Sequence, residues 1–191
     1  MVTIATSNPI EAATLLDQGF AWTAARVAAV SAGGLDAPTP CGSWTIGELL
    51  DHILDTLGVF ADAIAGPADE PVAPVSGESS WSAAFAELAA RTHQGWADPA
   101  AISRTYELRF GAMPGPVMAS ANLLEVVVHG WDTSQATSEA VDIPDGLALP
   151  ILTFARAAIT DDGRGDAFDP DLAVGATPGE QLVAFLGRAP R

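Results

Sequence analysis

The stretch that decides the fold is Asn122-Leu-Leu-Glu-Val-Val-Val-His-Gly-Trp-Asp132, which is mostly apolar yet contains a glutamate and a histidine. Glu125 and His129 are four residues apart, so on a helix their side chains lie one above the other on the same face. The leucines and valines around them predict a helix that is buried on most of its sides. A buried glutamate is rare unless it is paired or binds a metal. The stretch therefore predicts a core helix whose acid has a partner.

Length and composition indicate one globular domain. The chain has 191 residues, of which 49% are hydrophobic and 17% are charged. The length is sufficient for a sizeable core, and the composition is too apolar for a disordered chain. We interpret residues 1–191 as a single domain, with a core at about 9–160 and a tail at 161–191.

The charge balance and the cysteine count exclude several classes of protein. With 24 acidic and 8 basic residues the formal net charge is -16, which repels phosphate backbones and anionic lipid. We therefore expect no nucleic-acid partner and no membrane partner. The single Cys41 excludes an internal disulfide and a cysteine-based zinc cluster. The sequence shows neither a signal peptide nor an apolar run of membrane length, which predicts a cytoplasmic protein.

Capping patterns divide the chain into helices. Asn8-Pro-Ile-Glu11 begins a helix at about 9–32, which Gly33-Gly34 ends. Thr45 and Glu48 form a capping box that begins a second helix at about 45–65. Further helices are predicted from about Ser80 to Asp98, at about 115–137 and 145–160, and from Thr177 to Gly187. The predicted class is all-α, a four-helix bundle with a short helical C-terminal tail.

The connections between these helices are also informative. Residues 66–79 are rich in proline and glycine and exceed the usual bundle connection of about 2–8 residues. A connection of this length permits a crossover, so that successive helices need not be antiparallel neighbours. Residues 104–110 alternate polar and apolar, which predicts a short extended segment, and residues 111–116 are typical of a turn.

A third residue joins the glutamate and histidine as a candidate metal ligand. His52 lies at the edge of the apolar stripe of the second helix, from which it could turn inward. Two histidines and one carboxylate with an open position are the pattern of catalytic zinc sites, and related sets bind other divalent metals. The open position would hold water or a thiolate, whose pKa the metal lowers. An ion pair between Glu125 and a histidine, without metal, is the structural alternative.

Other polar residues near these motifs have simpler interpretations. Asp132, one turn after His129, could accept a hydrogen bond from a ligand imidazole, but we favour a solvated or arginine-paired acid. Cys41 could be a nucleophile or ligand, and we favour a small buried hydrophobe. His93 is interpreted as a surface histidine.

Two motifs resemble a known family. Thr39-Pro-Cys-Gly-Ser-Trp-Thr-Ile-Gly-Glu-Leu-Leu-Asp-His52 and Leu124-Glu-Val-Val-Val-His-Gly-Trp-Asp132 are similar to the metal-binding domain of mycothiol-dependent maleylpyruvate isomerases, part of the DinB/YfiT-like group. The tail, from Phe168-Asp-Pro to Gly187-Arg-Ala-Pro190, resembles an uncharacterised actinobacterial branch of that group.

The resemblance implies a fold, a metal and a cosubstrate. The fold would be a DinB-like four-helix bundle with a crossover after the second helix. The metal would be divalent, most often zinc with nickel as an alternative, and its ligands would be His52, Glu125 and His129. The cosubstrate would be mycothiol or a similar thiol. The isomerases carry a further C-terminal domain that contributes to their active site; only a short tail is present here, so the substrate is left open.

The functional hypothesis is a divalent-metal-dependent enzyme that activates a low-molecular-weight thiol for S-transfer to, or isomerisation of, a small electrophile. The alternative is a non-catalytic helical module that binds a metal or a small ligand. The expected partner is a small molecule, and the apolar first and fifth helices leave room for a homodimer.

Overall fold

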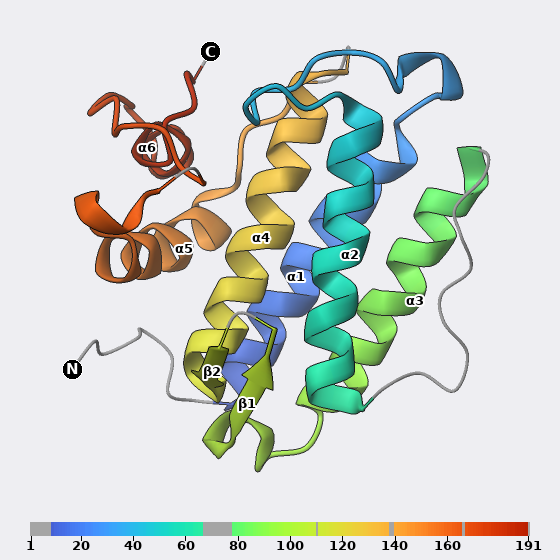
Figure 1. The fold of residues 1–191 in the computed structure, drawn as a ribbon, viewed down its shortest axis with the longest axis vertical. Coiled ribbons are helices and arrows are strands. Elements are labelled where there is room, and N and C mark those ends of the chain that lie inside the picture. Colours follow the sequence, from blue (N-terminus) through green and yellow to red (C-terminus); the bar gives the residue numbers. More distant parts are fainter. Residues whose placement is uncertain (1–8, 67–77, 110, 138–139, 166, 191) are drawn as a thin grey trace.

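The computed structural model, which describes residues 9–66, 78–109, 111–137, 140–165 and 167–190, is a helical bundle with a small hairpin and a helical tail (Figure 1). Long helices form the bundle: α1 (Pro9–Ala28), α2 (Ile46–Ala65), α3 (Glu78–Trp96) and α4 (Gly115–Gln135). The remaining elements are β1 (Thr105–Leu108), β2 (Gly111–Pro114), α5 (Asp145–Ala158), α6 (Pro178–Phe185) and the 3-10 turns η1 (Ala32–Gly34), η2 (Ala101–Ser103) and η3 (Asp161–Gly163). The predicted all-α class is confirmed.

The packing of the bundle confirms the predicted crossover. α1 packs against α3 and α4, and α2 packs against the same two helices. In Figure 1, α2 and α3 run in one direction while α1 and α4 run in the other. The chain therefore has to cross the length of the bundle between α2 and α3, and the connecting residues 67–77 lie outside the described ranges. This arrangement places α2 beside α4, the two helices that carry the candidate ligands.

Helix boundaries agree with the capping signals. Thr45 accepts a hydrogen bond from the backbone N–H of Glu48, and the Glu48 carboxylate accepts one from the backbone of Thr45, so the predicted capping box is present. Thr177 and Glu180 form the same box at the start of α6. The first helix ends at Ala28, earlier than predicted, because i→i−3 hydrogen bonds tighten the chain at the following residues. The predicted cap at Asn8 lies outside the described residues.

The prediction of a turn at 111–116 is wrong. The extended segment before it is confirmed as β1, but Gly111–Pro114 forms β2, which pairs antiparallel with β1 from Thr105↔Pro114 to Leu108↔Gly111. Proline is tolerated at a strand end, where the ladder needs no N–H from it. Pro116 then takes the first turn of α4, where its missing N–H costs nothing. The glycines and prolines of residues 111–116 therefore lie in a short strand and in the first turn of a helix.

Close packing of α1 and α4 buries one side of the apolar stretch 122–132 of α4. Gly130 of α4 faces α1, and a Cβ there would lie 2.6 Å from the hydroxyl oxygen of Thr23. The Thr23 hydroxyl donates to the backbone carbonyl of Val126 over 2.9 Å. Val126, Val127 and Val128 are all buried. The glycine therefore allows the approach that buries this side of α4 and leaves its other side for the candidate ligands.

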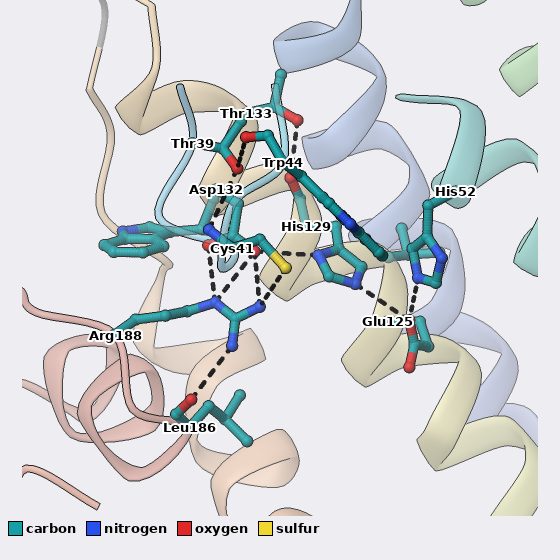
Figure 2. A network of polar contacts seen from close by, with 12 residues as sticks. Thr39, Cys41, Trp44, His52, Glu125, His129, Asp132, Thr133, Leu186 and Arg188 are labelled. Atoms are coloured by element: carbon teal, nitrogen blue, oxygen red, sulfur yellow. Dashed lines mark hydrogen bonds and ion pairs between the residues drawn. The ribbon is translucent and has the colours of Figure 1, made fainter. Parts of the chain in front are cut away.

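The tail folds back onto the bundle. α6 packs on α5, and Gly187 follows it with a φ of 82°, a left-handed conformation that glycine adopts without strain. A Cβ at Gly187 would also overlap Asp169. This turn directs Arg188 toward α4, as Figure 2 shows for its side chain.

Two further expectations concern the surface. Leu149 of α5 is an exposed large apolar residue, 53% accessible, and the homodimer stays a prediction. None of the helices in the described ranges is both long and apolar enough to cross a membrane.

Candidate functional site

The three predicted ligands face one another across the contact between α2 and α4 (Figure 2). Nε2 of His52 lies 3.6 Å from Oε2 of Glu125, and Nε2 of His129 lies 3.3 Å from the same oxygen. One potential ligand atom from each residue lies within 4.8 Å of the other two. The rings of His52 and His129 are nearly perpendicular, with centroids 5.0 Å apart. Residues from two separate helices therefore present nitrogen and oxygen donors to a common point.

These separations suit a shared cation better than direct hydrogen bonds. Donors held about 2.0–2.1 Å from a tetrahedral zinc ion would lie about 3.3 Å from one another. A charge-assisted N–H···O bond would instead bring the atoms to about 2.7–2.9 Å. Oε2 of Glu125 is buried and has no hydrogen-bond partner among the described residues. The donor set thus fits a divalent metal ion, for which nitrogen and carboxylate oxygen are ordinary ligands.

Glu125 is less buried than the sequence predicted. Its side chain is 30% exposed, because it faces a cavity rather than the valines that follow it in α4. Burial raises the pKa of this carboxyl, but the imidazoles of His129 and His52 outweigh burial and hold the pKa well below its usual range. The carboxylate is therefore ionised at neutral pH, as a metal ligand must be.

His129 is held in one orientation by Asp132. Its Nδ1 lies 3.0 Å from Oδ2 of Asp132, and an ionised carboxylate only accepts, so Nδ1 donates and Nε2 is left for a ligand. Burial lowers the pKa of His129, yet Asp132, Cys41 and Glu125 together raise it well above its usual value. In the metal-free protein the imidazole therefore also carries a proton on Nε2, which a bound metal ion would displace. The arrangement is the carboxylate–histidine pair that commonly supports a metal ligand.

Asp132 is in turn held by Arg188 from the tail. The guanidinium donates from Nε to Oδ1 over 2.8 Å and from Nη2 to Oδ2 over 2.9 Å. Asp132 is fully buried and Arg188 is only 7% exposed. Burial raises the pKa of Asp132. Its interactions with His129 and Arg188 lower the pKa by more than burial raises it, so the net shift is downward. The arginine-paired interpretation is confirmed and the solvated one is wrong, because the tail covers the acid.

The interpretation of Cys41 as a small buried hydrophobe is wrong. It is half-buried and lines the cavity, and Nη2 of Arg188 donates to its sulfur over 3.3 Å. The cause is the loop before α2, in which the Thr39 hydroxyl accepts from the backbone N–H of Cys41 and donates to the carbonyl of Trp44. Cys41, His129 and Asp132 form a second donor group that could hold a metal.

A cavity of about 370 Å³ opens beside the candidate ligands. Trp44 covers His52, with ring centroids 4.6 Å apart. One wall comes from the tail, through Ala167, Phe168, Asp169, Leu186 and Arg188. The other walls come from the loop before α2 and from α4, through Pro40, Cys41, Gly42, Ser43, Leu124 and Val128.

Sequence reasoning missed the contribution of the tail. Arg188 is 56 residues from Asp132 in sequence, and no local pattern connects the two. The capping box at Thr177 indicated a helix, but nothing in it gives the direction in which that helix packs. His93 is exposed as predicted, and its Nδ1 lies 2.7 Å from Oδ1 of Asp17.

Fold and site together define a helical bundle that presents two histidines and a glutamate from its second and fourth long helices. Residues 16–134 match the family model of the mycothiol maleylpyruvate isomerase N-terminal domain. The chain therefore belongs to that family, which confirms the resemblance of its motifs.

Relatives in sequence and structure agree with this assignment. Two uncharacterised proteins of Mycobacterium tuberculosis, from strains CDC 1551 and H37Rv, are each 34% identical over 172 residues, covering 88% of this chain and 92% of theirs. Two crystal structures of a mycothiol-dependent maleylpyruvate isomerase, one of a mutant, have TM-scores of 0.61 and 0.58 at 17% and 18% identity. Each comparison covers 78% of this chain and 70% of the isomerase. At such identities the likeness shows the shared fold.

Proposed function

We propose that the chain is a divalent-metal-dependent enzyme that activates a low-molecular-weight thiol, mycothiol or one similar to it, for S-transfer to or isomerisation of a small electrophile. The observation that carries the proposal is the convergence of His52, Glu125 and His129 on one point at a cavity wall. The chain belongs to the family of the mycothiol maleylpyruvate isomerase N-terminal domain, and this membership supports mycothiol as the thiol. Zinc is the first candidate for the metal and nickel the second, because both accept imidazole and carboxylate ligands.

The charge of the donor set favours an anionic fourth ligand. Two neutral imidazoles and one carboxylate offset one of the two charges of a divalent ion. Such an ion, when bound, would lower the pKa of a coordinated thiol and favour the thiolate, which is the nucleophilic form. Asp132 fixes the tautomer of His129, and Arg188 fixes Asp132. Trp44 packs beside His52, with the two ring planes tilted by 49°, and restricts the positions that the imidazole can take.

The cavity has the size and lining of a small-molecule site. Its volume of about 370 Å³ lies near the lower end of the range of about 300–1,000 Å³ for ligand pockets. Leu124, Val128 and Phe168 provide apolar surface for an electrophile, while the polar groups gather at the candidate ligands. A small electrophile and the sulfur end of the thiol could meet here.

A thiol-conjugation assay tests the proposal. We expect the zinc-loaded protein to accelerate the reaction of mycothiol with an uncharged electrophile such as monobromobimane. Glu125→Gln, which removes the anionic ligand, is expected to lower kcat/KM at least about 100-fold, by analogy with the loss that follows damage to groups supporting a metal ligand. His93→Ala is the control, because that histidine lies on the surface of α3, and it should keep the wild-type rate.

Two outcomes of this assay would contradict the proposal. A rate that survives Glu125→Gln but is lost in Cys41→Ser would assign the reaction to a cysteine nucleophile. Stoichiometric zinc binding without acceleration for mycothiol, bacillithiol or glutathione would favour the alternative, a metal-binding helical module without enzymatic activity.

A further inference from the structure

Asn122 is a buried polar residue whose amide has no partner among the residues that the structure describes. It lies one turn before Glu125 in α4 and is 0% exposed. Neither Nδ2 nor Oδ1 has a hydrogen-bond partner in the described ranges of the chain. A buried donor or acceptor that loses its hydrogen bond costs about 1–3 kcal/mol, so an amide left in this state would be a substantial burden on the fold.

The amide lies at a small void between α2 and α4. The void measures about 10 Å³, and Glu125 and His129 line both it and the larger cavity. On the α4 side it is lined by Asn122, Glu125, Val126 and His129, and on the α2 side by Ile53, Thr56, Leu57 and Phe60. A space of about 10–15 Å³ holds one water molecule, provided that two or more polar groups bind it. The amide and the Glu125 carboxylate supply those groups.

We propose that this void holds one ordered water, and that Asn122 acts through it as a positioning residue for Glu125. The amide can donate to the water or accept from it, whereas the ionised carboxylate can only accept. One hydrogen of the water is therefore directed at Glu125, which restrains the carboxylate from behind while its other side faces the histidines. The inference rests on the proposed metal site and adds a residue that supports it.

The test compares zinc affinity among Asn122 variants. Asn122→Leu keeps the number of side-chain heavy atoms, but its two methyl groups are larger than the amide, so it fills the void, displaces the water and cannot hydrogen-bond. We expect it to weaken zinc binding about 10–100-fold, the usual effect of losing a group that orients a metal ligand. Asn122→Ser keeps a polar group and leaves room for water, so its zinc dissociation constant should stay within a few-fold of wild type. Competition with a chromophoric chelator measures each constant.

A metal-independent readout separates positioning from packing. In the metal-free state, Asn122→Leu is expected to unfold at a temperature equal to or above that of wild type, because it removes a buried amide without opening a cavity. Ser120→Ala, two residues earlier in α4 and outside the lining of the void, is the control and should change neither quantity.

Two results would overturn this inference while leaving the metal site intact: wild-type zinc affinity in Asn122→Leu, or equal weakening in the leucine and serine variants. Absence of zinc binding by the wild type would overturn the metal site as well. A high-resolution crystal structure tests the water without any variant. One ordered water within hydrogen-bond distance of Asn122 and Glu125 would support the proposal, and an empty void would contradict it.

Discussion

Replacing Arg188 by alanine is expected to lower the free energy of unfolding by about 3–5 kcal/mol, the usual result of removing one partner of a buried ion pair. The variant leaves the carboxylate of Asp132 fully buried with His129 as its remaining charged partner. It also removes the contact through which the tail holds the loop at Cys41. Chemical denaturation of the metal-free protein at pH 7 measures the change.

Two comparisons make this result specific to the buried pair. Arg109→Ala removes a guanidinium that pairs with Asp55 on the surface, where such pairs contribute little, and it should leave stability unchanged. Combining Arg188→Met with Asp132→Asn removes both charges and should recover much of the loss. A decrease below about 1 kcal/mol in Arg188→Ala would show that Asp132 does not depend on the tail.

Zinc is expected to stabilise the wild-type protein by about 4 kcal/mol when free zinc is a thousandfold above its dissociation constant. For a chain of this size that corresponds to a rise in Tm of roughly 8–16 °C. The ion can stabilise the fold because His52 belongs to α2 while Glu125 and His129 belong to α4, so it links two helices that separate on unfolding. Thermal unfolding with and without zinc measures the gain.

Removal of one ligand should abolish this gain. In His52→Ala the added zinc is expected to change Tm by little, since the remaining donors come from a single helix. His93→Ala, which alters an exposed histidine of α3, should keep the full rise. An equal rise in wild type and His52→Ala would mean that zinc binds elsewhere.

Local signals explain why much of this molecule could be predicted from its sequence. Capping boxes are made by residues three apart, so Thr45 and Thr177 mark helix starts without knowledge of the fold. The four-residue spacing of Glu125 and His129 fixes their common face in the same way. His52 could be added because it stands at the edge of an apolar stripe, which places it near the core.

The parts that could not be predicted depend on contacts between distant segments. Arg188 reaches Asp132 only because α6 packs on α5 and the chain turns at Gly187. The exposure of Cys41 to the cavity follows from hydrogen bonds within its loop and from the same arginine. These contacts depend on how the tail docks, which hydrophobic periodicity does not encode.

We expect a metal ion to be bound by His52, Glu125 and His129 rather than by the neighbouring group of Cys41, His129 and Asp132. X-ray absorption spectroscopy of the zinc-loaded protein, without added thiol, tests it most directly. We predict only nitrogen and oxygen ligands at about 2.0–2.2 Å, including two imidazoles, and loss of one imidazole in His52→Ala. A sulfur ligand at about 2.3 Å, or a spectrum unchanged in His52→Ala, would contradict the account.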